Sequence, residues 1–384
     1  MKKGISLFLF LFSLQYSYSE KIPVKIFSGA KIDSLNISVV KGSYDVVCNG
    51  KILLSLSPAH NGSIRVALSK YGLGIRSESG PAGPFNNISL KSDAGDGILE
   101  LQCSESNSAI RGSFDDDLEI SSENNFLNMI NKVFLEKYVA SVLSAEIGYN
   151  AQPEFLKAEA IICRTYAVFN LNRHEKENYG LCSDVHCQVY KGNKEVTTQI
   201  IRSVNATEGK IITDSLGKVI ISAFHSNCGG RTQNSEDAWT GYRSYLRSVT
   251  DTFCLSQPHA RWEQKISAKN WNSNISGLSP DSYETIQNNF SRTDSGKSQM
   301  PGRPLVSRFR GLPVSVKKVR AVFGLKSSWF TLTEASDSIL IQGRGYGHGV
   351  GLCQEGAMRM ADLDHSCDDI IHYYYTGVFI SRRP

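Results

Sequence analysis

Residues 135–190 read LEKYVASVLSAEIGYNAQPEFLKAEAIICRTYAVFNLNRHEKENYGLCSDVHCQVY, a pattern that predicts two helices followed by a cysteine- and histidine-containing loop. In the first helix, apolar residues recur at the spacing of one helical face, and Glu146 takes the next position on that face. A carboxyl group at the end of a buried stripe loses hydration, which raises its pKa. The pattern therefore marks Glu146 as a candidate general acid. The alternative is a solvated glutamate, or one that pairs with Arg164 or Lys157.

The second helix is predicted to begin at Pro153, because proline suits the first helical position, where its missing N–H would have no partner. Apolar residues lie nearly all round this helix, which is typical of a helix buried on most sides. Lys157, Glu159 and Arg164 must therefore find partners or reach the surface. One arrangement would place them along a cleft that Glu146 faces.

The loop after these helices contains His174, Cys182, His186 and Cys187. Thiolate and imidazole are the usual ligands of zinc, and His174, Cys182 and Cys187 are the first candidates, with His186 next. A disulfide between Cys182 and Cys187 is an equally natural interpretation in an oxidising compartment. The residues alone leave both alternatives open.

Five glycines alternate strictly between Gly343 and Gly351, so no register gives the G-x-G-x-x-G spacing of a phosphate-binding loop. In an extended strand one face would be bare glycine, with Tyr346 and His348 on the other. A bare face allows close backbone approach. The segment is then either a sugar-binding wall, in which Tyr346 stacks and His348 donates hydrogen bonds, or a tightly packed structural strand.

The segment HSNCGG, residues 225–230, lacks the G-x-S-x-G pattern of a serine hydrolase elbow. Cys254 offers Cys228 a disulfide partner, which argues against a cysteine nucleophile. We expect a strand end and a glycine turn that place His225 and Ser226 in the cleft. The alternative for His225 is a turn histidine that is simply hydrogen-bonded.

Several motifs together resemble the SpoIID domain, that is, the stage II sporulation protein D family, whose other branch is the amidase enhancers. They lie in order within residues 126–379, and they are residues 138–146, EFLKAEAIICRTYA, LCSDVHCQVYKG, AFHSNCGGRTQNSEDAW and GRGYGHGVGLCQEGAMRMA.

The resemblance implies a peptidoglycan lytic transglycosylase that cleaves glycan strands between MurNAc and GlcNAc and leaves 1,6-anhydroMurNAc ends. In the best-known branch the strands have already lost their stem peptides. The resemblance also implies that Glu146 is the catalytic residue, first acid and then base, and it favours a structural zinc ion in the loop, because some members hold zinc there. The sugar-contacting residues predicted with this mechanism are Lys157, Arg164, Gln188, Tyr190, His225, Ser226, Tyr346, His348 and Gln354.

Two other function classes remain. One is a non-catalytic glycan-binding protein that activates a separate cell-wall amidase, the role for which the amidase enhancer branch is named. The other is a zinc hydrolase that uses the cysteine loop, for which removal of the metal would abolish activity without unfolding the protein.

The chain opens with two lysines, a short apolar run and a small-x-small pattern, which predict a signal peptide over residues 1–19. The protein is therefore expected to be exported, to the periplasm or the cell-wall side of a bacterium, with no transmembrane helix in the mature chain. Alternating short apolar runs predict an all-β accessory domain over residues 20–115. Residues 116–384 then form the SpoIID-like domain, with a helical block and β-structure, in an α+β protein.

The formal charge of +5 is small, and it gives no support to nucleic-acid binding. Nine cysteines in an exported chain favour disulfides. By position the pairs would be Cys48 with Cys103, Cys228 with Cys254, and Cys353 with Cys367. Cys163, inside the second helix, is expected to be an inert buried thiol.

Overall fold

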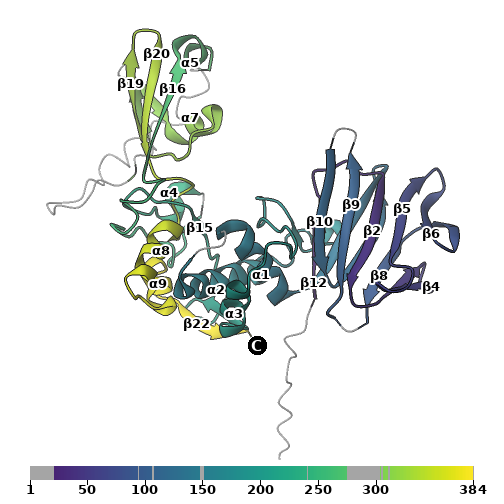
Figure 1. Cartoon of the computed structure of the whole chain (residues 1–384). Coiled ribbons are helices and arrows are strands. Elements are labelled where there is room, and N and C mark those ends of the chain that lie inside the picture. The colour runs from purple at the N-terminus through teal and green to yellow at the C-terminus, as the bar shows by residue number, and fades with distance from the viewer. Residues whose placement is uncertain are drawn as a thin grey trace, which may run out of the picture.

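The computed structural model describes residues 21–93, 95–105, 108–147, 151–239, 241–274, 303, 306–309 and 312–383. Helices and strands in several sheets confirm the α+β class. Figure 1 shows three parts in a row: a β-sandwich, a central group of helices, and a small sheet with its own helices. The predicted signal peptide lies outside the described residues. No helix in the described part of the chain is long and apolar enough to span a bilayer.

The β-sandwich consists of two mainly antiparallel sheets whose inner faces form one core with the first helices. Buried residues alternate along β1 and β3, as expected for strands with one face turned toward a core. The seven-stranded sheet has the order β13 (Leu181–Cys182), β1 (Lys21–Ile26), β12 (Phe126–Phe134), β11 (Asp117–Glu123), β8 (Ile88–Ser92), β3 (Tyr44–Cys48) and β4 (Lys51–Leu56). The six-stranded sheet has the order β10 (Ser108–Asp115), β9 (Ile98–Glu105), β2 (Ser34–Lys41), β5 (Ser63–Ser69), β6 (Gly72–Ser77) and β7 (Gly80–Phe85).

The sandwich continues beyond the boundary predicted near residue 115. Strand β12 pairs with β1 over residues 129–134, and β11 pairs with both β12 and β8. Residues 115–117 are predicted to mark either a boundary or a hairpin turn, and in the structure they form the sharp connection between β10 and β11. Strand β12 then leads without a break into helix α1 (Leu135–Ile147), so the accessory strands and the helices share a core.

Helix α2 (Pro153–Phe169) begins at the predicted proline and occupies the centre of the molecule. One side packs with helix α1 and the sandwich, through residues that include Leu156 and Ala160. The other side contributes Phe155, Ile161 and Ile162 to a second core. The prediction of a helix buried on most sides is confirmed, because α2 lies between two cores.

The second core is completed by helices and short strands that come from distant parts of the chain. Helix α3 (Thr198–Ala206) packs on α1 and α2, and α9 packs on α2 and α8. The remaining elements of this central part are η1 (Glu175–Glu177), β14 (Lys210–Thr213), β15 (Phe224–His225), α4 (Ser235–Ala238), β21 (Leu352–Cys353), α8 (Gln354–Asp362), α9 (Cys367–Tyr374) and β22 (Phe379–Arg382).

A third, smaller core lies in the part drawn at the top left of Figure 1. Trp271 and Trp262 lie at its centre, and Trp271 stacks on Phe323 with ring centroids 5.2 Å apart. Its elements are β16 (Arg261–Ser267), α5 (Ala268–Asn274), β17 (Val306–Phe309), β18 (Leu312–Ser315), α7 (Val316–Phe323), β19 (Phe330–Ala335) and β20 (Ser338–Arg344).

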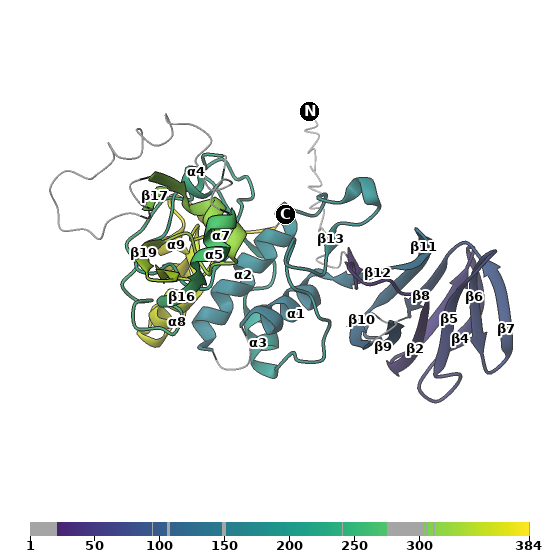
Figure 2. The same cartoon turned by 90° about the horizontal axis from the view of Figure 1, so that it is seen from above.

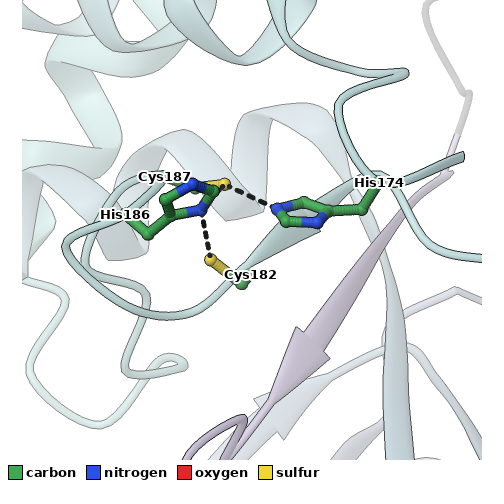
Figure 3. A group of neighbouring side chains, drawn as sticks. All are labelled: His174, Cys182, His186 and Cys187. Atoms are coloured by element: carbon green, nitrogen blue, oxygen red, sulfur yellow. Dashed lines mark hydrogen bonds between the residues drawn. The ribbon is translucent and has the colours of Figure 1, made fainter. Parts of the chain in front are cut away.

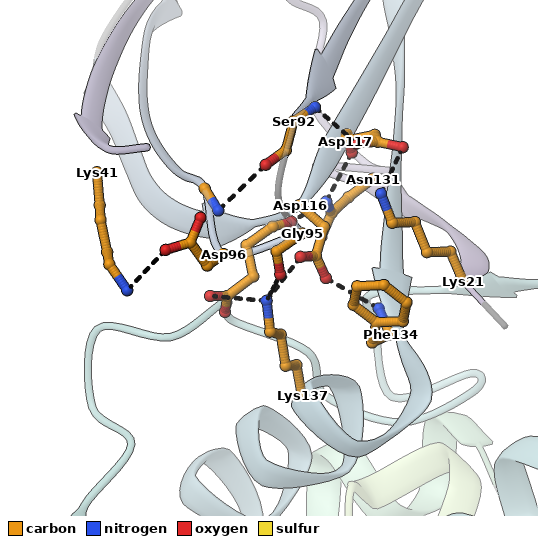
Figure 4. Close-up of polar contacts among 12 residues, drawn as sticks. Lys21, Lys41, Ser92, Gly95, Asp96, Asp116, Asp117, Asn131, Phe134 and Lys137 are labelled. Carbon is orange, nitrogen blue, oxygen red and sulfur yellow. Dashed lines mark hydrogen bonds and ion pairs between the residues drawn. The ribbon is translucent and has the colours of Figure 1, made fainter. Parts of the chain in front are cut away.

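Asp116 holds the sandwich to the start of α1 (Figure 4). Its side chain is fully buried, and its backbone has a φ of 65°. The carboxylate accepts hydrogen bonds from the backbone N–H of Phe134 at 3.0 Å and from Lys137 Nζ at 2.6 Å. One buried anion thus fixes both the end of β12 and the first turn of α1.

We predict that Asp116→Ala lowers the free energy of unfolding by about 2–4 kcal/mol. The alanine leaves the buried N–H of Phe134 without an acceptor, and it has no polar side chain to stabilise the positive φ of this position. Asp116→Asn keeps an acceptor and tolerates the left-handed conformation, so a loss of about 1 kcal/mol is expected. Urea unfolding followed by circular dichroism measures both. Equal losses for the two variants would contradict this role.

Candidate active-site groove

A groove of about 950 Å³ lies between the helices, the cysteine loop and the glycine-rich segment. Residues far apart in the sequence meet there, which is typical of a built site rather than a surface irregularity. Its polar and aromatic lining residues are Glu146, Tyr166, Phe169, Asn170, Arg173, His186, Cys187, Gln188, Ser222, Phe224, His225, Ser226, Trp239, Arg320, Tyr346, His348 and Gln354.

Glu146 lies in the last turn of α1 and opens into this groove. The backbone N–H of Val189 donates a hydrogen bond to its Oε1 at 3.3 Å. Burial raises the pKa of Glu146 above its usual value, while the Val189 hydrogen bond and Lys191 act in the opposite direction. The structure therefore favours the protonated form more than water does, as a general acid requires.

Glu159 lies behind Glu146 on α2, and its side chain is fully buried. Neither carboxyl oxygen has a hydrogen-bond partner among the described residues. Burial raises the pKa of Glu159 to about 8; the nearby Gln354 amide, which lies outside hydrogen-bonding geometry, acts in the opposite direction, and the charge of Glu146 raises the pKa further. Sequence reasoning identified Glu159 only as a polar residue that needed a partner, and its burial depends on the second core.

Two histidines form the wall opposite the cysteine loop. His225 is buried at the end of β15, and its Nδ1 donates to the carbonyl of Val350 at 3.2 Å, which leaves Nε2 without a partner in the described structure. His348 accepts the backbone N–H of Val350 at Nδ1, at 3.1 Å. Burial lowers the pKa of His348 to about 4 and that of His225 well below its usual value. Both rings are therefore neutral hydrogen-bonding groups at pH 7.

The glycine-rich segment departs from the predicted strand. Regular pairing ends at Arg344, and the four glycines from 345 to 351 all have positive φ, which a strand of L-residues does not adopt. The predicted close backbone approach is present, since a Cβ on Gly347 would lie 2.8 Å from His225 Cβ, and one on Gly345 2.6 Å from the Asn227 carbonyl. The glycines are needed to bring this segment against residues 223–229.

Most of the predicted sugar-contacting residues lie along the groove. Gln188 accepts a hydrogen bond from the Tyr138 hydroxyl at 3.3 Å and keeps its Nε2 unpaired among the described residues. Gln354 lies at the start of α8 beside Glu159, and Tyr346 exposes 41% of its surface at the rim. His225, Ser226 and His348 complete this set.

Three predicted contacts lie elsewhere. Arg164 is fully buried and forms a two-bond ion pair with Glu136, at 2.8 and 2.5 Å. Lys157 pairs with Glu154 on the far side of α2. Tyr190 is buried, donates to Asn131 at 2.6 Å and lines a separate depression. The helical pattern gave no sign of which polar side chains of α2 faced the groove. The structure places these three predicted residues outside its lining.

Arg173 and Arg320 line the groove and were not predicted. Arg173 donates to the Tyr166 hydroxyl at 2.7 Å and to the carbonyl of His186 at 3.0 Å. Arg320 comes from α7, in a separate part of the fold, so no local sequence pattern connects it with Glu146.

The four loop residues converge (Figure 3). One ligand atom from each of His174, Cys182, His186 and Cys187 lies within 4.8 Å of the others. Cys187 Sγ is 3.5 Å from His174 Nε2, and Cys182 Sγ is 3.7 Å from His186 Nδ1. Tetrahedral zinc with its usual bond lengths separates sulfur and nitrogen ligands by about 3.5 Å. The donor set therefore fits such an ion, and His186 belongs to it as fully as the three preferred residues.

The surroundings of His174 also suit a metal ligand. Its Nδ1 lies 3.3 Å from a carboxylate oxygen of Glu177, while Nε2 points toward Cys187. A carboxylate on the far nitrogen commonly fixes the ring of a metal-binding histidine. Two residues beyond Cys187, Val189 holds Glu146, so the loop positions the candidate acid.

Comparison with known proteins shows which family this chain resembles. The SpoIID family, described as "Stage II sporulation protein", matches residues 123–213. Stage II sporulation protein D of Bacillus subtilis is 30% identical over 271 residues, which cover 66% of this chain and 76% of that protein. An uncharacterised protein of Brachyspira hyodysenteriae is 30% identical over 67% of this chain and 69% of its own length. The Amidase enhancer of Bacillus subtilis is 25% identical over 62% of this chain and 40% of its own length.

We predict that Glu159→Gln removes a pH-dependent loss of stability. Because the folded pKa is about 8, above the value in the unfolded chain, stability is fully present below about pH 4.3 and falls as the pH rises toward 8. The neutral amide does not titrate, so between pH 5 and 8 the melting temperature of the variant should fall less than that of the wild type. Thermal unfolding across this range, with the strand variant Glu119→Gln as control, tests it. If the melting temperature of Glu159→Gln falls with pH as steeply as that of the wild type, the claim that Glu159 is a buried acid with a raised pKa is contradicted.

Proposed function

The chain belongs to the stage II sporulation protein D family, and on that premise we propose that it is an exported lytic transglycosylase of peptidoglycan. It would cleave glycan strands between MurNAc and GlcNAc, on the periplasmic or cell-wall side of a bacterium, and leave 1,6-anhydroMurNAc ends. Strands without stem peptides are the preferred form of substrate in this proposal.

The observation that carries the proposal is the single accessible carboxyl group. Among the described groove residues, Glu146 is the one acid, while Glu159 is buried behind it and neutral at pH 7. Glycoside hydrolysis usually requires two carboxylates at the bond, one as acid and one as base or nucleophile. A transglycosylase with an internal nucleophile needs one group that gives and then takes a proton.

In the proposed reaction, protonated Glu146 donates its proton to the glycosidic oxygen as the bond to C1 of the muramic acid breaks. The leaving sugar departs with that proton as a hydroxyl. The C6 hydroxyl of the same muramic acid then attacks C1, and the Glu146 carboxylate accepts its proton as the anhydro ring closes. Glu146 is thereby restored to its acid form, and no water is consumed.

The other groove residues bind and orient the glycan. His225 Nε2 and Gln188 Nε2 are unpaired but buried behind the groove lining, so a small side-chain movement would let neutral His225 accept and Gln188 donate a hydrogen bond to a sugar hydroxyl. Tyr346, half exposed at the rim, is placed to stack on a sugar ring. Arg173 and Arg320 supply positive charge suited to the muramic acid carboxyl groups of peptide-free strands.

Zinc is proposed at the loop, where His174, Cys182, His186 and Cys187 would hold it. Four protein ligands leave no open position, so the ion would be structural and would cross-link the loop. Its effect on the reaction would be indirect, through the hydrogen bond of Val189 to Glu146.

We predict that Glu146→Gln lowers the rate of strand cleavage by about 10²–10⁴-fold, because the amide neither donates nor accepts the proton. The mature protein and this variant are incubated with purified glycan strands, with and without stem peptides, and 1,6-anhydro ends are counted by mass spectrometry. Because burial raises the pKa of Glu146, wild-type activity should fall as the pH rises through that value. Glu119→Gln, in the sandwich, serves as the control and should keep full activity.

A second candidate function is an activator of a cell-wall amidase, favoured by the similarity to the Amidase enhancer. It uses the same groove for binding without cleavage. If neither wild type nor Glu146→Gln cuts either substrate while both bind it, catalysis is ruled out and the activator remains.

The zinc proposal predicts that Cys187→Ser loses one equivalent of metal and melts at a temperature lower by about 5 °C or more, because metal binding contributes directly to folding. Elemental analysis and thermal unfolding of protein purified without chelator measure both effects. A Cys182–Cys187 disulfide in the wild type, found by peptide mass spectrometry without reductant, would exclude the ion.

A further inference from the structure

A second group of metal-ligand side chains lies inside the protein, behind the groove wall. We propose that Cys228, Asp251, Cys254 and Cys353 form a structural site for a zinc-class divalent cation. One ligand atom from each lies within 4.8 Å of the others, and all four residues are buried. This buried cysteine cluster is separate from the loop residues of Figure 3 and is independent of the proposed reaction.

The distances are close to those of a tetrahedral site. Cys228 Sγ lies 3.4 Å from Cys254 Sγ and 3.2 Å from Asp251 Oδ2. Zinc bonds of about 2.3 Å to sulfur and about 2.1 Å to oxygen place such ligand atoms about 3.6–3.8 Å apart. Movements of a few tenths of an ångström would therefore accommodate the ion, with release of the thiol protons to solvent.

The ligands are already oriented by their neighbours. Asp251 Oδ1 accepts the backbone N–H of Phe253 at 3.0 Å and of Cys254 at 3.3 Å, and Oδ2 accepts the hydroxyl of Tyr374 at 3.0 Å. Cys353 Sγ accepts the backbone N–H of Cys228 at 3.2 Å. Hydrogen bonds of this kind commonly hold carboxylate and thiolate ligands in metal centres.

A buried cation compensates part of the charge that three thiolates and a carboxylate would carry. The Arg303 guanidinium donates to the carbonyl of Cys228 at 2.6 Å, and its Nε and Nη1 have no partner among the described residues. Gly349 leaves room for it, because a Cβ there would overlap the guanidinium. With the divalent ion and Arg303, the four negative charges of the ligands are reduced to a net charge of −1.

The rival interpretation is the predicted disulfide between Cys228 and Cys254. It would leave the Cys353 thiol and the Asp251 carboxylate buried beside the bridge, where their roles would be limited to the hydrogen bonds described above. Cys353 also faces this cluster, whereas Cys367, its predicted disulfide partner, contacts Asp368. A metal ion would use all three thiols and the carboxylate that converge here, whereas a disulfide would use only two of the thiols.

The site would hold together the wall that carries His225, Ser226 and Gln354. Strands β15 and β21 pair over only two residues each, and Cys353 is the partner of His225 in that pairing. Cys228 follows Ser226 by two positions, and Cys353 directly precedes Gln354. A cross-link here would fix segments that short strands hold weakly.

The test uses the mature full-length protein, exported and purified without chelator or reductant, with zinc per chain measured by mass spectrometry. Cys353→Ser should lose one equivalent relative to the wild type, and Cys353→Ser combined with Cys187→Ser should lose one more than Cys187→Ser alone. Cys48→Ser, which removes a buried thiol of the sandwich, should keep the wild-type content. Circular dichroism checks that each variant is folded.

Unchanged zinc in folded Cys353→Ser would overturn the proposal, as would a Cys228–Cys254 peptide in a non-reducing digest of the wild type. If Cys353→Ser does not fold, a Cys182→Ser and Cys187→Ser double variant, which lacks both loop thiols, is loaded with Co²⁺ instead. A thiolate-to-cobalt absorption band must then appear, since three thiolates remain in the buried cysteine cluster, and its absence would also overturn the proposal.

Discussion

The burial of helix α2 between two hydrophobic cores is the constraint on which the groove depends. Charged residues on the enclosed sides of this helix do not reach water, so each must be paired or neutral. Arg164 pairs with Glu136 and thereby locks α2 to α1, while Glu159 remains protonated. Because α1 is fixed in this way, Glu146 in its last turn lies in the groove, and its carboxyl group is half-buried there.

The groove wall itself contains little regular structure. Strand pairs of two residues, glycines at positive φ and long loops place the histidines and glutamines. Such segments gain little stability from backbone hydrogen bonds alone. Two groups of cysteine-containing side chains that could hold a metal ion flank them, one on the loop that holds Glu146 and one behind His225. The arrangement gives a reason for cysteines on both sides of a site whose proposed chemistry uses no thiol.

Local patterns in the sequence were sufficient for part of this account. Pro153 predicted the start of α2, and the apolar stripe before Glu146 predicted its half-buried place. Tertiary contacts decided the rest. Arg164 turns away from the groove toward Glu136, Arg320 arrives from a separate core, and Cys353 joins Cys228 and Asp251, which lie more than a hundred positions earlier. Glycine alternation predicted close approach but not the left-handed backbone, because both an extended and a looped path satisfy it.

The central claim is that one carboxyl group cleaves the strand without water. Digestion of peptide-free glycan strands in H₂¹⁸O, with mass spectrometry of the new muramic acid ends, tests it most directly. The account predicts anhydro ends that lack ¹⁸O, because the C6 oxygen of the sugar itself closes on C1. Reducing ends that carry one ¹⁸O atom would mean that water is the nucleophile, and would contradict it.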